Sequence, residues 1–341
     1  MGTVCGSRLY WYGDRGRAVC GNLEKSSDDL PGMYRDRLKG TYPDTWPESG
    51  KAMKRLRLGV QILFTIVTNG YVYGFLQGKI YQGRLKYVCV PGLNCYSCPG
   101  AAASCPIGAL QALLNRQGVE IPFAVLGFFF LFGSTLGRFV CGFLCPFGLV
   151  QDLLHKIPLF RKRKKLPFHH ILKYGKYLVL VSLVCIGSMF LFGGFAKVPA
   201  FCKYLCPSGT LLGALPLLGT NELLRSQIGG LFFWKLGILL FLMLLSVKVY
   251  RPFCQYLCPL GAVYGWFNRF SLVQVHWEQE RCISCGACQR ACPVDLSVSE
   301  ISCSPECIRC GRCIEVCPEK CLHYHRQPSE KPQETHLQNG E

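Results

Sequence analysis

The chain has 341 residues, half of them hydrophobic, with 23 cysteines and a formal charge of +18. This length suggests about two domains. Because the cysteines recur in Cys-Pro motifs, which are typical of metal ligation in a reducing environment, the composition argues against a scaffold built on disulfides.

Residues 1–52 are polar and Gly-rich, and they lack the pattern of a cleaved export signal. Met53, which is followed by Lys-Arg-Leu-Arg and the first apolar stretch, resembles a natural start. We therefore expect residues 1–52 to form a disordered N-terminal extension, to which no function is assigned.

Four stretches of the chain are long and apolar enough to span a bilayer. They are residues 58–78, 121–137, 177–196 and about 229–247. The fourth is interrupted by Lys235, whose ammonium group we expect to reach the membrane interface. Residues 53–269 are thus predicted to form a membrane all-α domain of four transmembrane helices.

Basic residues indicate how these helices are oriented. Lys51, Lys54, Arg55 and Arg57 precede the first stretch, and a basic run over residues 161–165 lies between the second and the third. The positive-inside rule places both flanks, and with them the C-terminus, in the cytoplasm. We expect a multi-pass protein of the cell inner (cytoplasmic) membrane, whose basic run contacts anionic membrane lipid and not nucleic acid.

A Cys-Pro-x-Gly motif occurs four times in the membrane part, beginning at Cys105, Cys145, Cys206 and Cys258. In the last three copies a second cysteine stands four residues earlier, at Cys141, Cys202 and Cys254. The first copy has Ala101 at that position and carries its upstream thiols at Cys95 and Cys98. Spans and motifs alternate along the chain, which predicts a duplicated two-helix unit. In each motif, proline would end a helix or turn, and glycine would let the backbone approach a bound group.

Because successive spans run in opposite directions, the motifs fall on alternating faces of the membrane. The inner-face thiols are Cys141, Cys145, Cys254 and Cys258, and the outer-face thiols are Cys95, Cys98, Cys105, Cys202 and Cys206. Four thiols are the complement of one [4Fe–4S] cluster, so one or two further clusters are expected here. Zinc sites or free thiols are the alternative on the inner face, and disulfides on the outer face. A hydrocarbon core ~30 Å thick is a long gap for direct electron tunnelling, so an outer cluster would have to be recessed, a further carrier would have to intervene, or the outer thiols would have another role.

The C-terminal part contains two copies of Cys-x2-Cys-x2-Cys-x3-Cys-Pro, the spacing of bacterial two-cluster ferredoxins. There, three cysteines of one loop bind one [4Fe–4S] cluster and the fourth reaches the other cluster. The predicted sets are Cys282, Cys285, Cys288 and Cys317 for the first cluster, and Cys307, Cys310, Cys313 and Cys292 for the second. Two four-cysteine zinc sites are the alternative.

Residues 270–324 are therefore predicted to form a small α+β ferredoxin-like domain with two clusters. Within it, Cys303 and Cys321 fall outside the repeat and are predicted to be spare. Residues 325–341 are polar and are expected to form a disordered tail.

These features favour a membrane iron–sulfur protein that relays single electrons between a cytoplasmic or quinol donor and a partner redox protein. No catalytic base, nucleophile or oxyanion constellation stands out, so we expect an electron-transfer subunit of an oxidoreductase system more than a self-contained enzyme. Quinol oxidation would need a proton acceptor near the interface, for which His155, His169 and His170 are candidates. A redox-sensing or metalloenzyme-maturation role is the alternative, because ligand motifs are the same for transfer and sensing. A small-molecule transporter ranks last, since the spans contain few polar groups.

Two stretches of the membrane part share a pattern, R-F-V-C-G-F-L-C-P-F-G-L-V-Q (138–151) and R-P-F-C-Q-Y-L-C-P-L-G (251–261). Together with the double ferredoxin motif, they resemble the membrane polyferredoxins over about residues 54–322. That family includes the iron–sulfur membrane subunit of periplasmic nitrate reductase systems and the C-terminal half of the nitrous-oxide-reductase regulator. The resemblance implies an integral membrane electron carrier in which Cys141/Cys145 and Cys254/Cys258 bind a redox centre. The outer-face group around Cys95 is not part of the family's minimal pattern.

Overall fold

The structure is a computed structural model that describes residues 4–5, 8–9, 50–114, 123–159, 162–191, 199–301 and 304–326. The extension predicted over residues 1–52 and the tail predicted over residues 325–341 lie almost entirely outside the described residues, as does Cys303. Within the extension, strands β1 (Val4–Cys5) and β2 (Arg8–Leu9) form an antiparallel pair.

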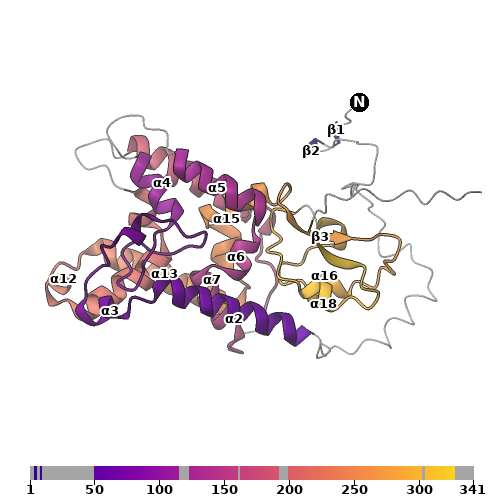
Figure 1. The fold of residues 1–341 in the computed structure, drawn as a ribbon, viewed down its shortest axis with the longest axis horizontal. Coiled ribbons are helices and arrows are strands. Elements are labelled where there is room, and N and C mark those ends of the chain that lie inside the picture. Colours follow the sequence, from indigo (N-terminus) through magenta and orange to yellow (C-terminus); the bar gives the residue numbers. More distant parts are fainter. Residues whose placement is uncertain are drawn as a thin grey trace, which may run out of the picture.

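The described chain from residue 50 onward folds into a helical part with a small α+β part at one end (Figure 1). The helical part contains α2 (Gly50–Asn69), α3 (Val72–Gln77), the short helix η1 (Arg84–Tyr87), α4 (Pro106–Leu114), α5 (Phe123–Thr135), α6 (Phe139–Phe143), α7 (Pro146–Lys156), α8 (His169–Leu172), α9 (Gly175–Val179), the π-helix η2 (Leu180–Leu191), α10 (Ala200–Tyr204), the π-helix η3 (Gly209–Ala214), α11 (Leu215–Thr220), α12 (Glu222–Ser226), α13 (Gly230–Lys248), α14 (Pro252–Tyr256) and α15 (Pro259–Phe267). The small part contains β3 (Val273–Trp277), α16 (Ala287–Ala291), α17 (Val298–Ile301), α18 (Arg312–Glu315) and β4 (Leu322–Arg326).

Two helices of the described chain are long and apolar enough to cross a membrane. One runs over His169–Ser188, through α8, α9 and most of η2, and the other is α13. They lie where the sequence predicts the third and fourth spans, and by length and composition they lend some support to membrane association. Residues 192–196 of the third predicted span lie outside the described chain.

The first two predicted spans have a different form. α2 begins before the predicted start of its span and ends at Asn69, and Gly70 separates it from the short helix α3. The backbone N–H of Tyr71 donates to the carbonyl of Gly100 at 3.1 Å, outside the helix, so the prediction of one unbroken helix over residues 58–78 is wrong. α5, in the second predicted span, has 13 residues, and residues 115–122 before it are not described.

The two inner-face Cys-x3-Cys-Pro units share one local structure, a short helix, a turn at the second cysteine and a second helix. Around Cys145 the helices are α6 and α7, and around Cys258 they are α14 and α15. Both cysteines are extended, with ψ angles of 115° and 114°, because a residue before proline is disfavoured in the helical region. The proline opens the second helix, where its missing N–H is not needed. Both units lie in the main hydrophobic core of the helical part.

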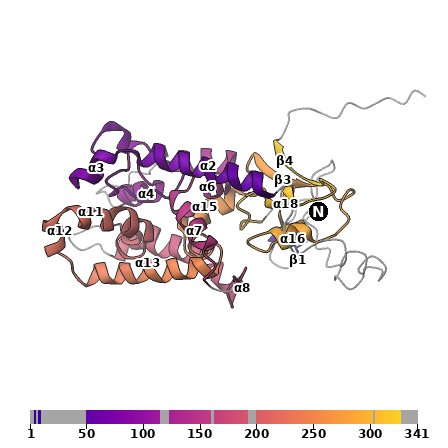
Figure 2. The same ribbon diagram turned by 90° about the horizontal axis from the view of Figure 1, so that it is seen from below.

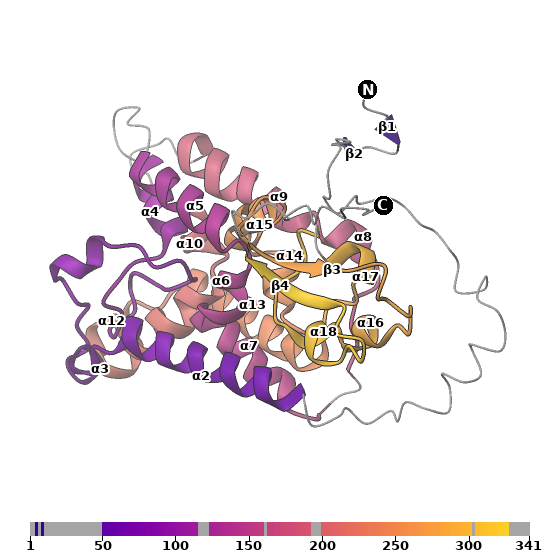
Figure 3. The same ribbon diagram turned by 45° about the vertical axis from the view of Figure 1, so that its right-hand side comes forward.

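In the small part, β3 and β4 pair in antiparallel register, with Val275 opposite Tyr324. Figure 3 shows α16 and α18 beside this sheet. Val275, Ile301 and Leu322 form a buried core together with several of the cysteines. The arrangement is a small α+β unit of the kind that the sequence predicts, and its last strand extends to Arg326.

The small part packs against the N-terminal end of α2 and against a loop of the helical part (Figure 2). The backbone N–H of Met53 donates to Oε1 of Glu315 at 2.6 Å. From the basic run, Lys164 and Lys165 lie 3.7 and 3.1 Å from the carboxylate of Asp295. These two lysines therefore contact the small part, and contact of the basic run with lipid stays a prediction.

Candidate metal centres

The two ferredoxin motifs adopt matching backbone conformations. Ser284 and Arg309 occupy equivalent positions, as do Gly286 and Gly311, and all four have positive φ angles between 53° and 75°. The residues before and after the second cysteine of each motif are therefore left-handed, which turns the loop tightly. At the two glycines this conformation costs little because no Cβ is present. The loops can thus direct three thiols toward a common centre.

The thiols of the small part form two neighbouring groups. The first ferredoxin group is Cys282, Cys285, Cys288 and Cys317, in which Cys288 interacts electrostatically with the other three. The second ferredoxin group is Cys307, Cys310, Cys313 and Cys292, in which Cys313 interacts with the other three. These are the sets that the spacing predicts, and in each set the fourth cysteine comes from the other motif. Cys313 also interacts with Cys288, so the two groups adjoin.

Burial and crowding give these groups the character of a cluster site. Burial raises the pKa of Cys288 to about 11 and that of Cys307 to about 12, and repulsion from neighbouring thiolates adds to both effects. Thiols with such raised pKa values stay protonated until a metal binds, and bound iron displaces their protons. Among the described residues, no three or more His, Cys, Asp or Glu side chains converge closely enough to hold a single metal ion.

A fifth thiol lies beside the first ferredoxin group. Cys321 is 3% exposed, its Sγ is 3.2 Å from the Sγ of Cys317, and it also interacts with Cys282. The sequence predicts Cys321 to be spare, because it stands outside the repeat. The structure places it next to ligand candidates, since it directly precedes β4 and is drawn into the core of the small part.

The four inner-face thiols come together in the core of the helical part. Cys141, Cys145, Cys254 and Cys258 are each at most 5% exposed, and Cys258 interacts electrostatically with the other three. Gln151 donates from Nε2 to the Sγ of Cys254 at 3.2 Å. We call these four cysteines the inner group, and Gln151 is a neighbour that sequence reasoning missed.

In each Cys-Pro-x-Gly motif, the glycine N–H interacts with the sulfur of the motif cysteine. The N–H of Gly209 lies 3.4 Å from the Sγ of Cys206. Equivalent interactions link Cys105 to Gly108, Cys145 to Gly148 and Cys258 to Gly261. Donors of this kind stabilise thiolates and tune the potential of a cluster that they hold.

One arginine precedes each inner unit, and the two arginines bind the units together reciprocally. Arg138, three residues before Cys141, donates from Nη2 to the carbonyl of Cys254 at 2.9 Å. Arg251, three residues before Cys254, donates from Nη1 to the carbonyl of Cys141. Each guanidinium also lies within 3.3 Å of where the motif glycine of the other unit would place a Cβ. Both arginines are at most 1% exposed, so the inner group sits between two buried cations.

The buried carboxylate of Asp152 balances one of these arginines. It accepts hydrogen bonds from Nε and Nη2 of Arg251 at 2.7 and 2.5 Å. Arg57, in α2, donates to the same carboxylate at 2.8 Å and to the hydroxyl of Tyr250 at 2.9 Å. Three segments of the helical part therefore meet at one ion network.

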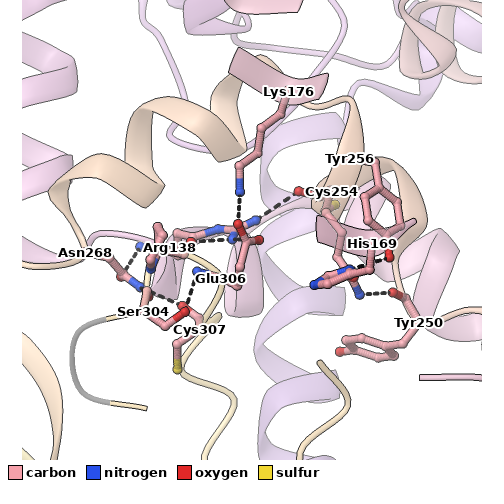
Figure 4. Close-up of polar contacts among 12 residues, drawn as sticks. Arg138, His169, Lys176, Tyr250, Cys254, Tyr256, Asn268, Ser304, Glu306 and Cys307 are labelled. Carbon is pink, nitrogen blue, oxygen red and sulfur yellow. Dashed lines mark hydrogen bonds and ion pairs between the residues drawn. The ribbon is translucent and has the colours of Figure 1, made fainter. Parts of the chain in front are cut away.

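The other arginine is balanced by a residue of the small part. Arg138 pairs with Glu306 at 3.1 Å, and the ammonium of Lys176 donates to the same carboxylate (Figure 4). Burial alone would raise the pKa of Glu306, but the charges of Arg138 and Lys176 outweigh burial and lower it. The carboxylate is therefore ionised and links the two parts of the molecule.

Four of the five outer-face thiols come together as the outer group. They are Cys95, Cys105, Cys202 and Cys206, in which Cys202 interacts electrostatically with the other three. Cys98 lies to one side, near Cys95 and Lys86. Lys235 of α13 donates to the carbonyl of Cys202 at 3.3 Å, so the charge in the first half of this helix faces the outer group.

The structure places Cys95 in the outer group and Cys98 outside it, although the sequence predicts both as outer-cluster ligands. Cys95→Ser should lower the iron content of the anaerobically purified protein by about four per chain, whereas Cys98→Ser should leave it unchanged. Iron and acid-labile sulfide per chain measure both. Loss of iron in Cys98→Ser, with full iron in Cys95→Ser, would reverse the assignment.

The loop that carries Cys95 and Cys98 folds back toward the inner group. A Cβ on Gly92 would lie 3.1 Å from the Cα of Cys145, and the N–H of Leu93 interacts with the Cys145 sulfur. Tyr264 is fully buried and interacts with both Cys141 and Cys105, and within the described chain its hydroxyl has no hydrogen-bond partner. One buried side chain thus interacts with both thiol groups.

The three candidate histidines lie in different settings. Nδ1 of His169 is 3.0 Å from the hydroxyl of Tyr256, which stands between the two inner cysteines of its unit. Nδ1 of His155 is 3.1 Å from the carbonyl of Ser246, and His170 is exposed. Of the three, His169 is linked most directly to the inner group.

Two protein-family models match the chain, and both are described as a 4Fe-4S binding domain. The first matches residues 104–121, 117–167, 178–219 and 231–277, which contain the Cys-Pro-x-Gly motifs. The second matches residues 275–296, which contain the first ferredoxin motif. No solved structure matches the chain.

Several curated proteins are similar to about half of this chain or somewhat more. Uncharacterized protein MJ0750 of Methanocaldococcus jannaschii is 32% identical over 203 residues, which cover 58% of this chain and 75% of the relative. The methylamine utilization ferredoxin-type protein MauN of Paracoccus denitrificans is 31% identical over 201 residues, covering 55% of this chain and 60% of MauN. The putative electron transport protein YccM of Escherichia coli is 26% identical over 185 residues, covering 51% of this chain and 46% of YccM.

Proposed function

Because this chain belongs to a polyferredoxin-like family of 4Fe-4S binding proteins and carries several [4Fe–4S] clusters, we propose that it is an integral membrane relay for single electrons. It passes them between a cytoplasmic or quinol donor and a partner redox protein. Relatives described as ferredoxin-type and electron transport proteins support the electron-transfer role. The membrane, the number of clusters and the route are the parts that this proposal adds.

One observation carries the proposal, the arrangement of sixteen thiols in four adjoining groups. The two ferredoxin groups adjoin at Cys288 and Cys313. The second ferredoxin group adjoins the inner group, since a Cβ on Gly142 would lie 2.6 Å from the carbonyl oxygen of Ile308. The inner and outer groups both interact with Tyr264. The proposed order is therefore first ferredoxin group, second ferredoxin group, inner group and outer group.

A [4Fe–4S] cluster, when bound, supplies reversible one-electron chemistry. The chain contributes the thiolates, the motif glycine N–H groups that donate to sulfur, and two buried guanidinium groups that offset the negative charge of the inner thiolates. The apolar core around the inner and outer groups excludes water from them. Burial and hydrogen bonding are the means by which a protein sets cluster potentials.

In this proposal four segments cross the membrane. His169–Ser188 and α13 are two of them, and α5 and the interrupted pair α2–α3 are the others. The small part and the basic run over residues 161–165 lie together, and the positive-inside rule puts both in the cytoplasm. The outer group then lies toward the other face, where a partner redox protein exchanges electrons.

A quinol donor would need a group that accepts its protons. His169 fits this role, because it stands at the start of a candidate span and pairs with Tyr256 beside the inner group. We therefore place a quinol, where it is the donor, at this end of the membrane part.

The test is anaerobic isolation from membranes followed by a redox titration recorded by EPR. We expect the protein to leave the membrane fraction only with detergent, and all clusters to be reduced by one donor and quickly reoxidised by one acceptor. A protein that sheds a cluster or changes conformation on oxidation would be a sensor. A protein found in the supernatant without detergent would contradict the proposed membrane location.

A further inference from the structure

We infer that Glu306 is the positioning residue that holds the second ferredoxin group against the inner group and so forms the junction where electrons pass between the two parts. The inference rests on the proposed function, because it requires a cluster at each group. No bond changes at this junction. One electron leaves the second ferredoxin group, and one electron arrives at the inner group.

The contacts of Glu306 carry the inference. The residue directly precedes Cys307, is 8% exposed, and belongs to the small part. Figure 4 shows its carboxylate between the guanidinium of Arg138 and the ammonium of Lys176, which both come from the helical part. Arg138 also donates from Nη1 to the carbonyl of Pro305 at 2.5 Å. One side chain thus joins the Cys307 loop to the arginine that holds the inner group.

Neighbouring hydrogen bonds fix the same loop on both sides of Glu306. Asn268 donates from Nδ2 to the carbonyls of Ser304 and Cys307, each at 2.8 Å. Its Oδ1 accepts from the backbone N–H of Arg138 at 3.1 Å. Asn268 is 1% exposed, so these bonds form away from solvent and define a single position for the loop.

The backbones of the two groups approach closely at this point. Gly142 directly follows Cys141, Ile308 directly follows Cys307, and a Cβ on Gly142 would lie 2.6 Å from the Ile308 carbonyl oxygen. A side chain at position 142 would therefore displace the loop. Because electron tunnelling falls steeply with distance, this close backbone approach beside Cys141 and Cys307 favours transfer between the two groups.

The two reciprocal arginines explain why an ion pair holds the junction together. The carboxylate that balances Arg251 is Asp152, within the helical part, whereas the one that balances Arg138 is Glu306, from the small part. Loss of Glu306 leaves Arg138 and Lys176 as buried cations without a counter-charge. Docking of the small part therefore completes the charge balance around the inner group. It also sets the distance between the inner group and the second ferredoxin group.

The test compares Glu306→Gln with Asp295→Asn in the full-length, anaerobically purified protein. Asp295 joins the small part to Lys164 and Lys165 of the helical part through exposed ion pairs, so its variant is the matched control. We expect Glu306→Gln to keep the wild-type iron content, to slow electron transfer from the small part to the membrane clusters by about 10–100-fold, and to raise the inner-cluster potential. The potential rises because a negative charge has been removed nearby. Glu306→Asp should restore part of both properties.

Wild-type transfer and potential in Glu306→Gln would overturn the inference. If Glu306→Gln loses iron, Gly142→Ala is the deciding variant, because its added methyl group disturbs the same contact without removing a charge. Slowed electron transfer in Gly142→Ala with full iron content supports the junction. An unchanged electron-transfer rate in Gly142→Ala overturns it. Failure of the proposed function is a different result, namely a wild-type protein that contains only the ferredoxin pair, at about eight irons per chain.

Discussion

Replacing Asp152 with asparagine is expected to destabilise the helical part by about 3–5 kcal/mol. The carboxylate is 6% exposed and accepts hydrogen bonds from two arginines, Arg251 and Arg57. An asparagine leaves both guanidinium groups buried without a counter-charge, which is the costly way to break a buried ion pair. The measurement is the midpoint of unfolding in detergent, with tryptophan fluorescence as the readout.

The control for this variant is Asp295→Asn, which removes a carboxylate that also has two cationic partners. Here the side chains of Lys164 and Lys165 are 44% and 39% exposed, so the expected loss is within about 1 kcal/mol. Equal destabilisation by the two variants would show that the buried network around Asp152 has no special importance for the fold.

Cys254→Ser is expected to remove the inner cluster, at a loss of about four irons per chain, and to leave the ferredoxin pair in place. The Cys254 thiol is 5% exposed, interacts with Cys145 and receives a hydrogen bond from Gln151, so it stands inside the inner group. Serine is a poor ligand for iron in such clusters, since the soft thiolate is what they select. Iron and sulfide analysis with EPR of the reduced protein would record the loss.

Cys185→Ser is the matched control, because Cys185 lies in the third predicted span but outside the thiol groups. This variant should keep the full iron content and all EPR signals. If Cys254→Ser also keeps them, the assignment of the inner group is wrong.

The groupings of cysteines follow from the sequence to different degrees. The ferredoxin sets follow from short-range spacing, because two or three residues between ligands leave the loop few conformations, as Ser284, Gly286 and their counterparts show. The inner set follows from the alternation of spans, and the structure brings the same four cysteines together. The choice of Cys95 over Cys98 does not follow, since it depends on how a long loop folds back onto Gly92.

The residues that surround the thiols depend on contacts between distant parts of the chain. Arg138 and Glu306 are 168 residues apart. In the sequence, Arg138 is only a charged residue at the end of a predicted span, and Glu306 is only a charged residue before a cysteine. The contact made where the first span breaks at Gly70 is another such case, because the N–H of Tyr71 bonds to the distant carbonyl of Gly100. Helix propensity and hydropathy predict neither contact, since both contacts arise from tertiary packing.

The most direct test of the account is the iron and acid-labile sulfide content of the wild-type protein, purified anaerobically in detergent. Four thiol groups of four cysteines each predict about sixteen irons and about sixteen sulfides per chain. A content of about twelve irons per chain would show that the outer group holds no cluster and is not part of the relay. A colourless protein that holds zinc, or one with about eight irons, would contradict the central claim that the clusters continue from the small part into the membrane.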